Sequence, residues 1–368
     1  MAKVTFYPLG NADSYLIQTD QNKYFIFDFA EMRNPEDNAD KRMPLKENLK
    51  KDIGWPIRNY VDVLAISHGD NDHVKGISDT FWLEHAKTYQ DANKIIINEL
   101  WVPAALIVEE GSEDDTKIIR QEARHRFLEK KGIKVFARPE HLKDWLESKG
   151  KRFDDYHDLI CDAGKIVPEW TIAKNGIQFF VHAPFAERTD DGLLDRNTNS
   201  LVIQISIYSE GNITKLLATG DSVSEQWEKI VKITRYHKND EKLGWDILKI
   251  PHHCSYKAMS ENKDANIIIP TEEFQWLLDQ GSNCGILVST SKEIPATTTE
   301  QPPHIEAYRR YQETAKQLDA DLVVTMEYPN KQNPQRLVIT IDGNGPTLKK
   351  IISSPSVITT SQRAPRVG

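Results

Sequence analysis

The six residues from His68 to His73 constrain this chain more than any other part of its sequence. They carry two histidines and two carboxylates with the spacing His-x-Asp-x-Asp-His. The apolar run 62–67 before them predicts a buried strand, so these polar side chains belong to the loop at its C-terminal end. Carboxylates repel one another and crowded imidazoles desolvate one another unless a cation binds them. The loop therefore indicates a metal site, although a lone His-x-Asp would more often be a polar turn.

Two later segments repeat the pattern of an apolar strand that ends in ligand-type residues. The strand 215–219 is followed by Asp221, and the strand 247–250 is followed by His252 and His253. A single Asp after a glycine is ordinary turn chemistry when it stands alone. Together with the first loop, these strand ends predict one shared site.

The three segments, in this order, resemble the metal-binding motifs of the metallo-β-lactamase-fold hydrolases, whose first motif usually reads His-x-His-x-Asp-His. Asp70 stands where the second His is expected, which resembles the branch that includes the C-terminal domain of ComEC-type competence proteins and the phosphorylcholine esterases. The later segments resemble the family's Thr-Gly-Asp and Pro-His-His-Gly-Ser, with Cys254 in place of the Gly. The polar turn at Asn199 and Ser200 follows the same branch. The resemblance covers about residues 4–343 and implies an α/β fold, a metallo-β-lactamase-like αββα sandwich.

The resemblance also implies two divalent cations, Zn²⁺ or Mn²⁺, with Mg²⁺ as a further candidate. We expect the following ligand sets: His68, Asp70 and Asp221 for one cation, with Asn199 close to it, and Asp72, His73, Asp221 and His253 for the other. Two such cations lie about 3.5–4 Å apart and lower the pKa of a bridging water, so that hydroxide exists at neutral pH. Asp72 is expected to orient this hydroxide. The oxygen donors of Asp70 and Asn199 shift the preference toward Mn²⁺ or Mg²⁺ without excluding Zn²⁺.

The adjacent histidines are expected to have different roles. Neighbouring residues at a strand end point in opposite directions and do not easily bind the same ion. We expect His253 to be a metal ligand and His252 to be a catalytic acid/base group, and the reverse assignment stays open. If the family's glycine is needed for a positive φ, Cys254 predicts local strain or a different turn.

Other residues are expected to contact the substrate or to support the ligands: Asp28, Asn199, Ser200 and His304. Asp28 ends an apolar strand and resembles an early Asp of the family, which would orient the His68 loop rather than bind metal. His182 lies inside a strand-like run, where a half-buried structural histidine is the favoured interpretation and a ligand is the alternative.

The metal-site residues span positions 68 to 253 and must meet in one core, so we expect one hydrolase domain over residues 1–348. Two insertions are predicted. The polar segment at about 31–58 fits either a solvated helix face or a substrate contact. The segment at about 113–160 has helical patterns, and its role stays open.

The end of the chain has two further strand patterns and a basic tail. The patterns at 322–326 and 337–341 predict a closing hairpin. Residues 349–368 contain two Lys, two Arg and no acidic residue, which predicts a flexible or partner-bound tail.

The composition restricts the location and the partners of the chain. No apolar run approaches the roughly 20 residues of a membrane helix, and the N-terminus has no signal-peptide core. The cysteines, Cys161, Cys254 and Cys284, cannot all pair. We therefore expect a cytoplasmic protein with no membrane partner and leave any protein partner open. The formal net charge of −8 opposes nucleic-acid binding overall, although local basic segments could offset it.

The leading function is hydrolysis of a phosphodiester, with nucleic acid as one candidate substrate, because an oxygen-rich metal site suits a charged phosphate. An alternative is a small-molecule ester, thioester or lactone hydrolase that uses the same metals. A third interpretation is a non-catalytic metal-binding interaction module. That module would be expected to have lost ligands, whereas this chain keeps five of them: His68, Asp72, His73, Asp221 and His253.

Overall fold

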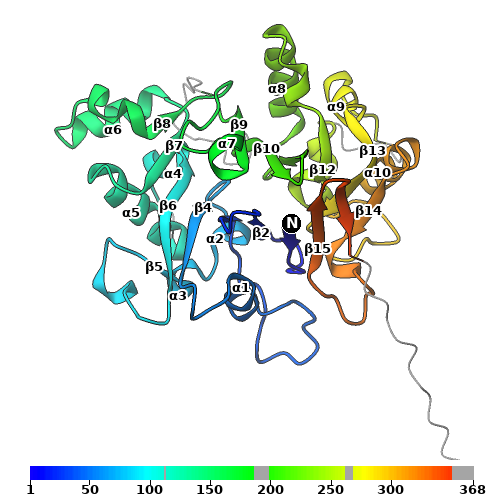
Figure 1. Ribbon diagram of the computed structural model, residues 1–368, viewed down its shortest axis with the longest axis horizontal. Coiled ribbons are helices and arrows are strands. Elements are labelled where there is room, and N and C mark those ends of the chain that lie inside the picture. Colours follow the sequence, from blue (N-terminus) through cyan, green and yellow to red (C-terminus); the bar gives the residue numbers. More distant parts are fainter. Residues whose placement is uncertain (112, 186–198, 262–267, 350–368) are drawn as a thin grey trace, which may run out of the picture.

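A computed structural model of the chain describes residues 1–111, 113–185, 199–261 and 268–349. Two mixed β-sheets pack face to face, and helices cover the outer face of each sheet (Figure 1). The layers follow the order helix, sheet, sheet, helix. The αββα sandwich predicted from the sequence is therefore confirmed.

The first sheet is antiparallel on one side and parallel on the other. Strands from β16 to β3 in sheet order pair antiparallel, and strands from β3 to β8 pair parallel. In sheet order the strands are β16 (Gly345–Leu348), β15 (Leu337–Asp342), β1 (Ala2–Phe6), β2 (Tyr15–Gln18), β3 (Tyr24–Phe27), β4 (Tyr60–Ala65), β6 (Ile95–Pro103), β7 (Ile133–Phe136) and β8 (Ile160–Cys161), and the short β5 (Phe81–Trp82) pairs with β6.

The second sheet repeats this organisation with six strands. Its antiparallel part contains β9 to β11, and its parallel part contains β11 to β14. In sheet order the strands are β14 (Asp321–Val324), β13 (Gly281–Ser289), β12 (Trp245–Lys249), β11 (Asn212–Ala218), β10 (Val202–Ser209) and β9 (Ile177–Ala183).

Strands that are buried on both faces explain the continuous apolar runs of the sequence. In β4 and just beyond it, Val63 and Ala65 pack between the two sheets, while Leu64 and Ile66 pack under the helices of the first sheet. The helices on that side include α1 (Leu45–Ile53), α4 (Ala104–Val108), α5 (Asp114–Leu128) and α6 (Glu140–Ser148). The second sheet is covered by α8 (Ser224–Tyr236), α9 (Glu272–Leu278) and α10 (Ile305–Gln317).

Two sequence expectations need correction. The segment 113–160 is not only helical, because it also supplies β7 and β8 to the edge of the first sheet. The predicted closing hairpin is wrong, since β14 belongs to the second sheet and β15 to the first. Within the described residues, no helix is long and apolar enough to cross a membrane. Residues 350–368, nearly all of the predicted tail, lie outside the described part of the chain.

Candidate metal centre

The ligand-type side chains lie in loops that follow strands of both sheets. The loop after β4 carries the residues from His68 to His73, and the short helix α2 (Asn71–Val74) begins within it. Asp221 follows β11, and His252 and His253 follow β12. Because β3 and β4 pair parallel, as do β11 and β12, their C-terminal ends lie at the same edge of each sheet. The loops of the two sheets meet at these edges, since the His73 Nε2 of the first lies 3.4 Å from the Asp221 Oδ1 of the second.

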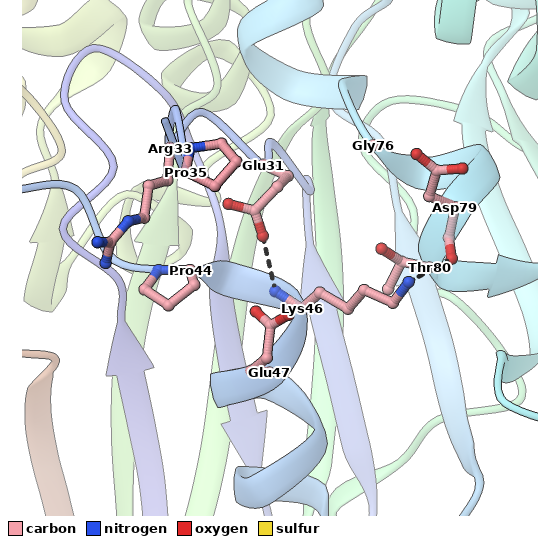
Figure 2. A pocket seen from close by; sticks show the side chains of 9 residues that line it. All are labelled: Glu31, Arg33, Pro35, Pro44, Lys46, Glu47, Gly76, Asp79 and Thr80. Carbon is pink, nitrogen blue, oxygen red and sulfur yellow. Dashed lines mark hydrogen bonds between the residues drawn. The ribbon is translucent and has the colours of Figure 1, made fainter. Parts of the chain in front are cut away.

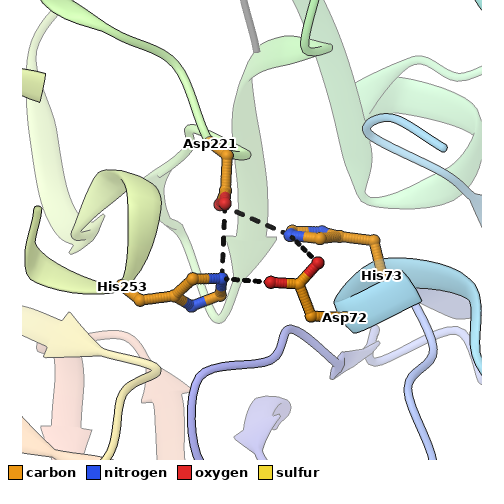
Figure 3. A group of neighbouring side chains, drawn as sticks. All are labelled: Asp72, His73, Asp221 and His253. Atoms are coloured by element: carbon orange, nitrogen blue, oxygen red, sulfur yellow. Dashed lines mark ion pairs between the residues drawn. The ribbon is translucent and has the colours of Figure 1, made fainter. Parts of the chain in front are cut away.

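Four of the predicted ligands form one close group: Asp72, His73, Asp221 and His253. Figure 3 shows the four side chains pointing toward one another. The His253 Nε2 lies 3.3 Å from Asp72 Oδ2 and 3.3 Å from Asp221 Oδ2. The His73 Nε2 lies 3.4 Å from Asp221 Oδ1. One ligand atom from each residue lies within 4.8 Å of all the others, which is close enough for a single cation to contact them together.

A second group consists of His68, Asp70 and Asp72. The His68 Nε2 lies 3.4 Å from Asp70 Oδ2. Asp72 contributes ligand atoms to both groups, because Asp70 and Asp72 lie on the same loop. Asp221, the shared ligand expected from the sequence, belongs to the close group. The side chains of Asp70 and Asp72 are 37% and 32% exposed, so solvent reaches the groups from this loop.

The three imidazoles are held through Nδ1, which leaves Nε2 available. The His73 Nδ1 bonds to Asp28 Oδ2 at 2.9 Å, and the His253 Nδ1 donates to the Thr290 carbonyl at 2.8 Å. The His68 Nδ1 lies 3.1 Å from Ser67 Oγ. In the described part of the chain, the three buried Nε2 atoms make no hydrogen bond of good geometry, and each instead lies 3.3 or 3.4 Å from a carboxylate oxygen. Metal-binding histidines usually have this arrangement, in which an outer partner fixes the ring and the other nitrogen faces the ion.

The carboxylates make the centre favourable for positive charge. Burial alone would lower the pKa of His253, but Asp221 and Asp72 outweigh it and raise this pKa to about 10. Burial also opposes the charge of His73, yet Asp28 and Asp221 raise its pKa well above the usual range. Divalent cations would satisfy the same carboxylates and the Nε2 atoms together. The donor set therefore fits divalent metal ions.

The loop of the adjacent histidines does not have the extended backbone that the sequence analysis assumed. His252, His253 and Cys254 all have positive φ, at 49°, 50° and 66°. The positive φ at Cys254 is a conformation that costs free energy for a residue with a Cβ, which is the local strain expected from the sequence. The two rings do not point in opposite directions across a strand, because the His252 Nε2 also approaches Asp221 Oδ2, at 3.9 Å. His253 belongs to the close group, whereas His252 lies at its border, with a 16% exposed side chain. Burial lowers the pKa of His252.

The residues expected to support the ligands occupy different places. Asp28 accepts hydrogen bonds from Ser67 N and Ser67 Oγ, both at 2.7 Å, in addition to its bond with His73. The buried Ser200 accepts a hydrogen bond from Asp221 N at 3.4 Å, and the preceding Asn199 is half-buried. Asp28 and Ser200 therefore hold the backbone or the rings of the ligand loops.

Two further histidines have contacts with the backbone. The Nδ1 of the buried His304 accepts a hydrogen bond from Tyr256 N at 3.3 Å. The backbone N–H of His304 donates to the Cys254 carbonyl at 3.0 Å. These contacts brace the loop of His252 and His253. His182 is buried in β9, where its Nε2 donates to the Lys242 carbonyl at 2.8 Å. Its surroundings fit the structural role rather than the ligand role.

Sequence reasoning missed Asp13 and Lys249, which are both buried at the centre. Asp13 lies between β1 and β2, and its Oδ1 is 3.7 Å from His253 Nδ1. Lys249 is the last residue of β12 and forms an ion pair with Asp13. A lysine inside the apolar run 247–250 was a usable signal, because a charge in a buried strand requires a partner. Asp13 has no comparable signal, since it lies in an ordinary polar turn.

Two cavities adjoin the segments that carry the centre. Asn71, between Asp70 and Asp72, lines a cavity of about 610 Å³. A second cavity, of about 300 Å³, lies between the segment 31–47 and the residues after His73 (Figure 2). Its lining residues are Glu31, Arg33, Pro35, Pro44, Lys46, Glu47, Gly76, Asp79 and Thr80. The predicted insertion 31–58 thus contributes to a cavity wall and is not only a solvated helix face.

No family model matches the sequence, and no curated protein matches it. Three solved structures are similar at low identity. A putative metal-dependent hydrolase from Parabacteroides distasonis is 10% identical, with 87% of this chain and 92% of that chain covered and a TM-score of 0.37. Tm1679, a metal-dependent hydrolase of the β-lactamase superfamily, is 11% identical, with coverages of 92% and 98% and a TM-score of 0.39. The class B3 di-zinc metallo-β-lactamase LRA-12 from an Alaskan soil metagenome is 15% identical, with coverages of 75% and 90% and a TM-score of 0.32.

Proposed function

We propose that the chain is a metal-dependent hydrolase with two divalent cations and that its substrate is a phosphodiester. The observation that carries this proposal is the convergence of three imidazole Nε2 atoms, which make no hydrogen bond of good geometry in the described part of the chain, on carboxylates from two different sheets. Buried polar atoms without hydrogen bonds are unfavourable, so such a cluster points to a bound cation. A non-catalytic interaction module has no comparable need for solvent-reachable ligands such as Asp70 and Asp72.

The close group would hold one cation, and His68, Asp70 and Asp72 would hold the other. Two cations supply a water of lowered pKa and charge stabilisation for the reacting group. The chain's own residues prepare this site. Asp28 holds the Nδ1 of His73, so that Nε2 is the nitrogen that would face a cation at the centre. The Thr290 carbonyl does the same for His253.

His252 is the candidate acid/base residue. Its ring borders the close group and is partly exposed, so it can meet both a substrate and solvent. A neutral imidazole beside the reacting group can accept a proton or return one to a leaving oxygen. Asp72, with its Oδ2 at 3.3 Å from His253 Nε2, is placed at the junction of both groups and would orient the attacking water.

Two arguments support a phosphodiester over a lactone or thioester. Asp70 and Asp72 make the second group rich in oxygen, and oxygen donors favour hard cations such as Mn²⁺ and Mg²⁺. Hard cations bind phosphate oxygens well. The resemblance of the motifs to those of ComEC-type proteins supports the same substrate class.

The experiment is a hydrolysis panel with metal-free protein reloaded with Mn²⁺, Mg²⁺ or Zn²⁺. The substrates are a bis-aryl phosphate, single-stranded and duplex DNA, RNA, an aryl ester, a thioester and a lactone. His253→Gln is compared with His237→Gln, a control at an exposed histidine that follows α8. We expect phosphodiester cleavage that His253→Gln abolishes and His237→Gln keeps. Cleavage of only the ester, thioester or lactone would show that the substrate is not a phosphodiester. The absence of any metal-dependent cleavage would refute the hydrolase activity.

A further inference from the structure

Lys249 is a fully buried lysine at the metal centre. Its Nζ donates to the Gly220 carbonyl at 2.9 Å, forms an ion pair with Asp13 and lies 3.8 Å from Asp221 Oδ1. The carboxylates of Asp13 and Asp221 face this ammonium and compensate its buried charge. Lys249 thus contacts the turn that carries Asp221, and it does so from the protein interior.

Asp13 connects this lysine to the other ligand loops. Its backbone N–H donates to the Asp72 carbonyl at 3.0 Å. Its Oδ1 accepts a hydrogen bond from Thr290 Oγ1, and the Thr290 carbonyl accepts the Nδ1 proton of His253. Its Oδ2 lies 3.9 Å from His73 Nδ1. One carboxylate therefore contacts, or indirectly holds, ligands from both sheets.

We propose that the Asp13–Lys249 pair is a positioning element of the metal centre, which fixes the Asp221 turn and the His73 and His253 loops in the geometry that binds divalent cations. This proposal rests on the proposed function, because it assumes that these residues bind metal. Neither Asp13 nor Lys249 needs to touch the cations. Removal of an outer partner of metal ligands typically weakens metal binding about 10- to 100-fold.

Substitution of Lys249 separates a positioning role from a simple charge effect, because the two predict opposite changes in cation affinity. Lys249→Met removes a positive charge near the carboxylates, and Coulomb attraction alone would then make cation binding tighter. Loss of the contacts to Gly220 and Asp13 would instead make binding weaker. Lys249→Met also leaves Asp13 buried without its counter-charge, which threatens folding.

The double variant Asp13→Asn with Lys249→Met removes both charges and so avoids an unpaired one. Asp13→Asn alone is the third variant, since Asn keeps the size of the side chain and an acceptor oxygen, and Lys249 then retains Asp221 Oδ1 at 3.8 Å as its counter-charge. The control is Lys134→Met, which removes another buried lysine. Lys134 pairs with Glu169 and lies on β7, two strands from β4 in the first sheet.

The measurements are calorimetric titration of Mn²⁺ and Zn²⁺ into metal-free full-length protein and thermal unfolding of the same samples. We expect the double variant to unfold within a few degrees of wild type and to bind metal about 10- to 100-fold more weakly. Lys249→Met, where it folds, and Asp13→Asn should also bind more weakly, while Lys134→Met should keep wild-type metal affinity even if its Tm falls.

Wild-type affinity in the double variant or in Asp13→Asn would overturn the proposal and leave the pair with a purely structural role. Tighter binding in Lys249→Met would show that the lysine acts through its charge. Equal weakening in Lys134→Met would show that the titration reports only global stability. If wild-type protein itself binds no divalent cation, the proposed function fails instead, so the two failures are distinguishable.

Discussion

The Nδ1 of His73 bonds to Asp28 Oδ2 at 2.9 Å, and this contact sets the direction in which the Nε2 of His73 faces. Asp28 also accepts two hydrogen bonds from Ser67, the residue before His68. One carboxylate thus fixes a ligand ring and the start of the ligand loop together. The hydrolytic function proposed above depends on this kind of outer support.

Asp28→Asn should weaken metal binding about 10- to 100-fold, because the amide no longer stabilises the Nδ1 proton of His73 as a carboxylate does. Titration of Mn²⁺ and Zn²⁺ into metal-free protein measures the change. Glu99→Gln is a matched control, since Glu99 is a half-buried carboxylate on β6 that accepts a hydrogen bond from Trp101. Unchanged affinity in Asp28→Asn would show that His73 needs no outer carboxylate.

Asp70→His should move the metal preference toward Zn²⁺, because imidazole is a softer donor than carboxylate. The ratio of the Zn²⁺ and Mn²⁺ dissociation constants, measured for wild type and variant, tests this expectation. A ratio that does not change would show that Asp70 does not reach a cation.

Gly69→Ala should destabilise the protein by about 1–3 kcal/mol, because the ligand loop packs tightly against α4 and α5. An added Cβ would lie 3.0 Å from Leu106 Cδ1 and 3.2 Å from Thr116 Cγ2. Urea unfolding gives the difference in free energy. Gly244→Ala, whose Cβ would meet neighbours only at 3.5 Å or more, should change it by less. Equal stability of the two variants would contradict the tight packing.

The stability of the metal-free protein should fall on acidification partly because of His182. Burial lowers the pKa of His182 to about 4, against about 6.5 for an unfolded histidine. The unfolded state therefore takes up the proton first, and the free energy of unfolding should drop by about 2 kcal/mol from pH 7 to pH 5.

His182→Gln keeps a donor for the Lys242 carbonyl and removes this titration. Its free energy of unfolding should fall less than that of wild type between pH 7 and pH 5, as measured by urea unfolding at both values. Equal decreases in the two proteins would show that His182 is protonated in the folded state.

The sandwich was implied by the resemblance of the motifs to those of the metallo-β-lactamase-fold hydrolases, whereas the strand ends were predicted from local patterns. Apolar runs followed by His68, Asp221 and His253 are visible without a structure. The pairing of β15 with β1 was not visible, because it joins residues more than 300 positions apart, and the assumed hairpin with β14 was therefore wrong.

The supporting residues of the centre were predicted less completely than the candidate ligands. Asp13 reaches His73 and His253 only through the packing of the two sheets, which no local pattern encodes. The different roles expected for His252 and His253 assumed an extended backbone. Both residues instead have positive φ. Their different roles follow from their distances to Asp221 Oδ2, which are 3.9 Å for the His252 Nε2 and 3.3 Å for the His253 Nε2.

The metal content of purified protein at equilibrium with Mn²⁺ or Zn²⁺ tests the central claim most directly. We predict two divalent ions per wild-type chain, fewer in His253→Ala, and two in His252→Ala, whose turnover should nevertheless fall by about 10²- to 10⁴-fold. Metal loss in His252→Ala alone would reverse the roles of the two histidines. A wild-type chain that binds no divalent ion, or a His253→Ala variant that keeps both, would contradict the metal centre.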